Sequence, residues 1–149
     1  MSAQIGAVSA TTQSTVKVLA TSVEGTRAAL ASAIPLAAGA GARLVVAVPR
    51  IVPYPIAIDG PVDTSSVLAK RIESIVHELG GSARVDVCLC RRLDDVVAHL
   101  GSDGTIVVGG RPGHWLMSPE ERLARRLSRL GRHVVFVASV PDATANGRR

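Results

Sequence analysis

Apolar and polar residues follow one another along this chain in a pattern that predicts five strands and four helices. Short β-branched or aliphatic runs predict buried strands, and apolar residues spaced three or four positions apart predict helices. The predicted strands are 16–20, 44–48, 83–89, 105–108 and 134–140. The predicted helices span about 22–39, 65–79, 93–100 and 119–130. This alternation predicts an α/β fold, a three-layer sandwich in which helices flank a five-stranded parallel sheet.

Capping signals mark where two of these helices begin. The segment Thr21–Glu24 matches a capping box, which predicts Thr21 as the N-cap of the first helix. Pro35 predicts a kink or an early end of that helix, because proline lacks the N–H that continues the hydrogen-bond ladder. A second capping box, from Ser118 to Glu121, begins the fourth helix.

The run TIVVGGRPGHW, residues 105–115, is the most informative stretch for a ligand site. Its apolar part stops abruptly at two glycines and is followed by Arg111, Pro112 and Gly113. Ligands of open α/β sheets lie beyond the carboxyl ends of parallel strands, beside a topological switch point. We therefore expect any small ligand to contact residues 109–114.

Three segments resemble the universal stress protein family: VKVLATSVEGTRAAL, LVVAVP, and TIVVGGRPG followed by a helix and a final apolar strand. The resemblance covers about residues 16–140. It implies a strand order of 3-2-1-4-5, a homodimer formed through strand 134–140, and, in nucleotide-binding members, ATP held between strands one and four. The candidate ligand-binding residues of that crevice are Thr21, Ser22, Val48 (beside any base), Gly109, Gly110, Arg111 and Gly113.

The nucleotide-binding motif of this family is degenerate here. Nucleotide-binding members carry an aspartate after the first strand, where this chain has Thr21. Their second motif is a glycine, two residues, a glycine, nine residues, then glycine and serine or threonine. Gly110 and Gly113 match the first pair, but Leu123 and Ala124 occupy the closing positions. The phosphate-binding glycine and serine are therefore missing.

The start of the fourth helix is also predicted to be a poor phosphate site. Unpaired amides at a helix start attract anions, but Ser118 and Glu121 already satisfy amides there. The carboxylates of Glu120 and Glu121 would repel a triphosphate. Arg111 and His114 keep the site open to a smaller anion.

Positive charge is concentrated at the end of the chain. Acidic and basic side chains balance through residue 110, so the whole net charge of +5 lies in residues 111–149. Arginines recur at helical spacing in the fourth helix and form a candidate interaction face for an acidic protein, or a solvated face with a Glu121–Arg125 pair. These arginines are Arg122, Arg125, Arg126 and Arg129. The scarcity of aromatic residues argues against nucleic acid, and Trp115 is expected to pack against the fourth helix.

The cysteines, the histidines and the apolar runs argue against a disulfide, a metal site and a membrane span. Cys88 and Cys90 share one face of a strand, where they cannot easily bond to each other, and are expected to be buried, reduced thiols. The four histidines show no ligand-like spacing, so no metal site is predicted. We find neither a signal peptide nor an apolar run of about 18 residues, which predicts a cytoplasmic protein without a membrane contact.

No catalytic residues are predicted, and the chain is not expected to be an enzyme. The hydroxyls of Thr21, Ser22 and Thr26 lack a histidine and an acid to activate them, and neither a Walker A motif nor GxGxxG occurs. We expect a disordered arm at 1–15, a universal-stress-protein-like domain at 16–140 and a flexible basic tail at 141–149.

Three functional hypotheses follow. The first is a non-catalytic regulatory or stress-response domain with a degenerate nucleotide crevice and no assigned cofactor. The second is a stress protein that binds ATP or AMP through a reshaped loop at Arg111. The third is a protein-interaction module that uses the arginines of the fourth helix.

Overall fold

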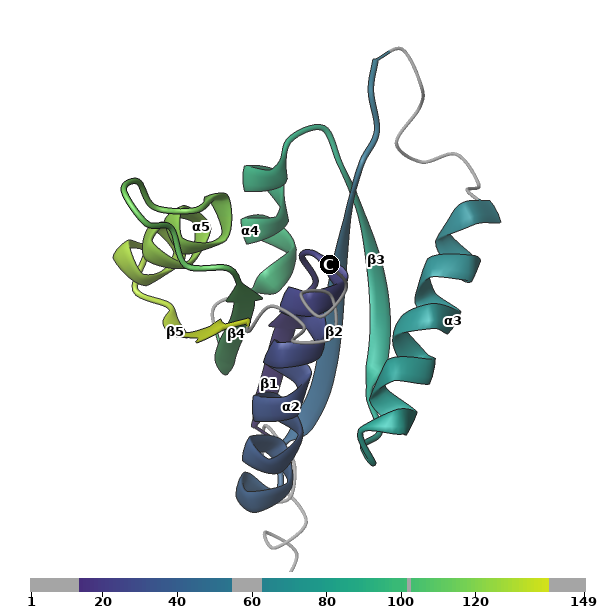
Figure 1. Cartoon of the computed structure of the whole chain (residues 1–149). Coiled ribbons are helices and arrows are strands. Elements are labelled where there is room, and N and C mark those ends of the chain that lie inside the picture. Colours follow the sequence, from purple (N-terminus) through teal and green to yellow (C-terminus); the bar gives the residue numbers. More distant parts are fainter. Residues whose placement is uncertain (1–13, 55–62, 102, 140–149) are drawn as a thin grey trace, which may run out of the picture.

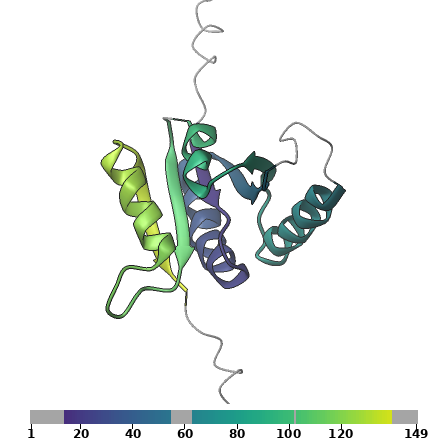
Figure 2. The same cartoon turned by 90° about the horizontal axis from the view of Figure 1, so that it is seen from above.

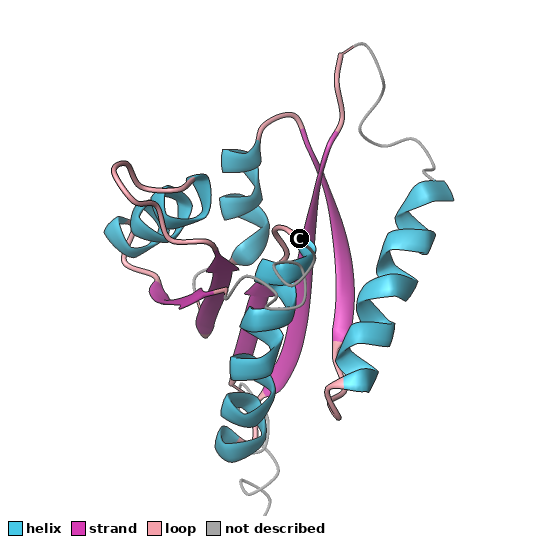
Figure 3. Ribbon diagram, viewed as in Figure 1, coloured by secondary structure: helices cyan, strands magenta, loops and turns pink. Residues whose placement is uncertain are grey.

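The computed structural model describes residues 14–54, 63–101 and 103–139 and confirms the five-stranded parallel sheet (Figures 1 and 3). The strands are β1 (Thr15–Leu19), β2 (Arg43–Ile51), β3 (Arg84–Cys90), β4 (Thr105–Gly110) and β5 (His133–Ala138). The four α-helices of the described residues are α2 (Val23–Ala40), α3 (Asp63–Glu78), α4 (Val96–Leu100) and α5 (Pro119–Arg129). A 3-10 turn, η1 (Leu93–Asp95), leads into α4. None of the described helices combines the length and apolar character needed to cross a membrane.

The sheet has the order β3-β2-β1-β4-β5, as the family resemblance implies. In the middle of the sheet Leu19 of β1 pairs with Ala47 of β2 on one side and with Val108 of β4 on the other. Every pairing is parallel, so the carboxyl ends of β1 and β4 open side by side. This is the topological switch point of the fold.

Two apolar layers hold the helices against opposite faces of the sheet (Figure 2). Consecutive strand residues point to opposite faces, so Val18 packs under α2 and α3 while Leu19 packs under α4 and α5. Leu30 of α2 and Leu127 of α5 are both fully buried in these layers. The predicted three-layer sandwich is therefore confirmed.

The first helix differs in two details from its prediction. Its N-cap is Ser22, whose Oγ accepts the N–H of Gly25 at 3.0 Å, and not Thr21, whose hydroxyl bonds elsewhere. The helix also continues through Pro35 to Ala40. Burial of Ala37 and the left-handed cap at Gly41 hold the turns that follow the proline.

Strand β2 is longer than the predicted strand 44–48, with one additional residue before it and three after it. Pairing with β1 ends at Ala47, but pairing with β3 continues to Ile51. Pro49 lies in this one-sided extension, where its missing N–H removes no hydrogen bond from a second neighbour.

Both ends of the described chain are close to their predicted positions. Strand β1 begins at Thr15, and the remainder of the predicted arm lies outside the described residues, apart from Ser14. Strand β5 ends at Ala138, two residues before the predicted end, and residues 140–149 lie outside the described part of the chain.

Candidate functional site

A direct hydrogen bond joins the two strand ends where a crevice was expected. The hydroxyl of Thr21, just after β1, donates to the carbonyl oxygen of Gly109 in β4 at 2.6 Å. The N–H of Thr21 donates to Oγ1 of Thr26, a buried residue in the first turns of α2, at 3.0 Å. Thr21 is thereby fixed at both its backbone and its side chain. The carboxyl end of β1 is therefore joined to the carboxyl end of β4.

Helix α2 crosses this junction without a gap. A Cβ atom built on Gly109 would overlap the carbonyl oxygen of Gly25 and lie 2.8 Å from its carbonyl carbon. A Cβ atom on Gly25 would in turn lie 2.5 Å from the carbonyl oxygen of Gly109. Glycine is therefore required on both sides, because the two backbones are in contact. At Gly25 and Gly109, therefore, no space remains between α2 and β4 beside the end of β1.

A carboxylate of the protein itself, that of Glu121, binds the backbone of the loop between β4 and α5. One carboxylate oxygen of Glu121 accepts the N–H groups of Gly113 and Ser118, the latter at 3.2 Å. Ser118 Oγ accepts the N–H of Glu121 at 3.2 Å, so the predicted capping box is confirmed. Because Glu121 makes these bonds, the predicted Glu121–Arg125 pair is wrong.

The same bonds favour the ionised form of Glu121. The N–H of Gly113, followed by that of Ser118, lowers the pKa of this carboxyl group. Because the folded-state pKa is the lower one, the stabilisation is present at neutral pH and is lost as the pH falls through the folded-state pKa.

The other predicted residues of this loop do not converge on one cavity. Arg111 and Gly113 are exposed, and the side chain of Glu120 packs over the backbone of Gly110. Gly110 is buried, and its carbonyl accepts the N–H of Ser139 at 2.9 Å. Trp115 is 98% exposed, so its expected packing against the following helix is wrong.

A small apolar cleft lies above the carboxyl ends of β1 and β2, between α2 and α3. Its volume is about 110 Å³. Of the predicted residues, it brings together Thr21 and Val48. Ser22, Gly109, Gly110, Arg111 and Gly113 do not line it. The remaining lining residues are Ala20, Val23, Thr26, Pro49, Arg71, Ile72 and Ile75.

The contribution of α3 to this cleft was missed in the sequence. Ile72 and Ile75 belong to the apolar side of the predicted helix, which had to face the sheet, so Arg71 beside them had to lie at the edge of the same contact. That periodicity was the available signal. Arg71 is the charged residue among those that line the apolar cleft.

The four arginines of α5 form one exposed surface, called here the arginine face: Arg122, Arg125, Arg126 and Arg129. Together with Met117 they line a groove of about 480 Å³. Arg126 pairs with Asp94 at 3.0 Å, and Nη1 of Arg125 contacts the sulfur of Met117 at 3.3 Å. The predicted clustering of these side chains is thus present in the fold.

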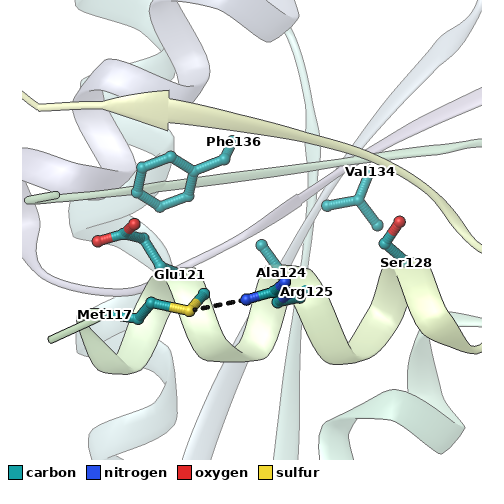
Figure 4. A pocket seen from close by; sticks show the side chains of 7 residues that line it. All are labelled: Met117, Glu121, Ala124, Arg125, Ser128, Val134 and Phe136. Atoms are coloured by element: carbon teal, nitrogen blue, oxygen red, sulfur yellow. Dashed lines mark hydrogen bonds between the residues drawn. The ribbon is translucent and has the colours of Figure 1, made fainter. Parts of the chain in front are cut away.

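A second groove, of about 340 Å³, separates α5 from β5 (Figure 4). Val134 and Phe136 of β5 point toward α5, where Ala124 lies below them. Met117 and Arg125 line both this groove and the arginine face. The two surfaces are therefore continuous around the start of α5.

The two thiols line neither of these grooves. Cys88 and Cys90 are buried in the layer beneath α4, as expected for two residues on one face of a strand. Burial raises the pKa of both thiols, and neighbouring negative charge raises it further. Both are therefore weak nucleophiles. Among residues 14–54, 63–101 and 103–139, no group of three metal-ligating side chains comes together.

Solved structures share this fold, whereas no family model and no curated protein sequence matches the chain. The universal stress protein from Archaeoglobus fulgidus aligns with a TM-score of 0.61 and 12% identity, over 88% of this chain and 98% of that one. A universal stress protein in complex with cAMP aligns with a TM-score of 0.61 and 17% identity, over 87% and 100%. The A. fulgidus protein in complex with dAMP gives 0.55 and 14%, over 85% and 98%. The chain therefore has the fold of universal stress proteins.

Proposed function

We propose that this chain is a non-catalytic regulatory domain of the universal stress protein type whose nucleotide crevice is closed from within. The observation that carries the proposal is the Glu121 carboxylate, which accepts the N–H groups of Gly113 and Ser118. Backbone N–H groups of a loop that leads into a helix start are the donors that an incoming phosphate needs. Here a side chain of the protein already uses them and adds negative charge.

The junction of β1 and β4 supports the same proposal. A nucleotide spanning the crevice would have to break the hydrogen bond between Thr21 and Gly109 and move α2 away from β4. The candidate residues are also divided between the cleft at Thr21 and Val48 and the separate loop at Arg111. In this proposal the domain acts through its surface and its assembly.

Genuine binding of ATP or AMP is the alternative, with Arg111 replacing the missing phosphate contacts. Its support is the cleft at Thr21 and Val48, together with the two solved proteins of this fold that hold cAMP and dAMP. The cleft volume of about 110 Å³ falls below the roughly 300–1,000 Å³ of typical small-molecule sites. This difference in size favours the closed crevice.

Thermal melts separate the two hypotheses. With millimolar ATP and Mg²⁺, AMP, cAMP or dAMP, we expect the melting temperature of the protein to stay unchanged. A ligand at a hundred times its Kd would add about 2.7 kcal/mol of stability, which a melt resolves easily. A rise that Arg111→Ala abolishes would instead establish the alternative. A rise that Arg111→Ala leaves intact would show that a nucleotide binds without Arg111, and it would also contradict the proposal.

We further propose that the domain forms a homodimer through β5. This strand is at the end of the sheet order, and among the described strands it pairs with β4 alone. Val135 is exposed on it, and Val134 and Phe136 are half-buried. An unpaired edge with apolar side chains is a ready template for a second strand.

Val135→Lys is expected to convert the dimer to a monomer, because a lysine on an edge strand opposes pairing with another strand. Sedimentation velocity measures the outcome directly. Val67→Lys on α3 is the matched control, since Val67 is also exposed and α3 lies on the opposite side of the molecule from β5 (Figure 1). A parent protein that sediments as a monomer, or a dimer that survives Val135→Lys, would exclude this interface.

An acidic protein is the proposed partner of the arginine face. A cytoplasmic location is proposed with it, because two buried, unpaired thiols suit a reducing compartment.

A further inference from the structure

The loop before α5 contains the chain's single tryptophan, Trp115, two residues before Met117, which lines the groove of the arginine face. Trp115 is 98% exposed and Leu116 is 83% exposed. The loop stands out from the body of the protein in both views (Figures 1 and 2). Two adjacent large apolar side chains exposed on a projecting loop, called here the Trp115–Leu116 tip, are typical of a contact site.

The arginine face carries charge that the fold leaves uncompensated. Its two nearest acids turn away: Glu120 packs over Gly110, and Glu121 bonds to the loop backbone. Arg126 pairs with Asp94, but Arg122, Arg125 and Arg129 have no carboxylate at ion-pair distance among the described residues. Three guanidinium groups are therefore available on one helix face.

Met117 links the charged surface to the apolar one. It follows Leu116 directly and lines the groove of about 480 Å³ between the arginines. A thioether adapts its shape to an apolar partner, and a guanidinium group binds carboxylates through two parallel hydrogen bonds. Tryptophan and arginine are also the residues that most often dominate binding at protein interfaces. The surface thus presents an apolar anchor next to paired hydrogen-bond donors.

We propose that the arginine face and the Trp115–Leu116 tip form one docking surface for an acidic segment of a partner protein that also carries apolar side chains. This rests on the proposed function, in which the domain acts through its surface. A peptide segment suits the surface better than a lipid bilayer does, because the arginines line a groove. In addition, the apolar side of α5, at Leu123 and Leu127, is buried against the sheet and cannot enter lipid.

The fluorescence of Trp115 tests the proposal without a label. Titrating the full chain with a synthetic peptide of repeating Glu-Glu-Leu is expected to shift the emission to shorter wavelength and to saturate. Peptides of glutamate alone and of repeating Gln-Gln-Leu are expected to bind about tenfold more weakly, because the first lacks apolar side chains and the second lacks negative charge. Raising the salt concentration should weaken the first peptide most.

Variants assign the site. The combined change Arg122→Glu, Arg125→Glu and Arg129→Glu is expected to reduce the affinity for the Glu-Glu-Leu peptide at least about tenfold. Leu116→Ser, which removes apolar surface but keeps the reporter, is expected to weaken binding by roughly threefold to tenfold. Lys70→Glu, an exposed charge reversal on α3, is the matched control and should leave the affinity unchanged.

Three results would overturn the docking surface: equal binding of the Gln-Gln-Leu peptide, full affinity in the Arg-to-Glu variant, or full affinity in Leu116→Ser. A saturable shift with phosphatidylserine vesicles and none with the Glu-Glu-Leu peptide would assign the surface to a membrane and refute it as well. The nucleotide melts are an independent readout. A stabilising nucleotide would contradict the closed crevice and leave the docking surface standing.

Discussion

Gly109→Ala is expected to lower the free energy of unfolding by at least about 3 kcal/mol, the upper end of the cost of overpacking a core. The added methyl group would overlap the carbonyl oxygen of Gly25 and lie 3.1 Å from the Cβ of Ala29. Both obstacles belong to α2, and one of them is backbone, so no side-chain rotation relieves the overlap. The helix must move away from β4. Urea unfolding monitored by circular dichroism measures the loss.

Gly39→Ala is the matched control for this substitution. Gly39 lies in the last turn of the same helix, and a Cβ atom there meets nothing within 4 Å. Because glycine is a poor helix residue, alanine in the last turns of α2 should stabilise the protein by up to about 1 kcal/mol. The two substitutions are thus expected to have opposite signs. A Gly109→Ala protein as stable as the parent would mean that α2 does not close the junction of β1 and β4.

The sheet could be predicted from the sequence because each strand carries its own signal. Residues 105–108 form an unbroken apolar run that ends at glycines, which suits a central strand buried on both faces. The start of α5 could also be predicted, since Ser118 and Glu121 are only three positions apart and cap the helix locally. Both of these features are decided within a short stretch of the chain, which is why they could be placed from the sequence.

The candidate site was harder to predict because its contacts are long-range. The bond from Thr21 to Gly109 joins residues 88 positions apart. It also explains the misplaced N-cap, since a hydroxyl that bonds to β4 is not available to cap α2, and Ser22 takes that role. The second acceptor role of Glu121, toward Gly113, depends on how the loop folds back and has no signature in the spacing of the capping box.

Charge was visible in the sequence, but its pairing was not. The spacing of Glu121 and Arg125 suggested an ion pair, yet the loop amides compete for the same carboxylate. Backbone N–H groups are already fixed, so bonding to them orders only the glutamate side chain. An exposed ion pair must also order the arginine, and it contributes only about 0–1 kcal/mol. The outcome leaves the arginine face more positive than the sequence alone suggested.

Leu127→Ala is expected to destabilise the protein by about 2–5 kcal/mol, the range measured for large-to-small changes in cores. Leu127 is fully buried and packs with Leu123, Ile106 and Val108 in the layer beneath α5. Truncation removes apolar contact and leaves a cavity that the sheet cannot refill, because β4 is fixed by pairing on both sides. Denaturant unfolding gives the difference in free energy.

Leu130→Ala is the control for this change, since the same side chain three residues later is 55% exposed and should alter stability by no more than about 0.5 kcal/mol. The contrast also bears on function, because Leu127 and the arginine face lie on opposite sides of the same helix. If only its buried side holds α5 on the sheet, Leu127→Ala should weaken binding of the Glu-Glu-Leu peptide in proportion to the fraction of molecules in which α5 has detached. Leu130→Ala should leave this binding unchanged. Equal stability of the two variants would show that α5 is anchored by contacts other than its leucines, and the arginine face would then need a different structural support.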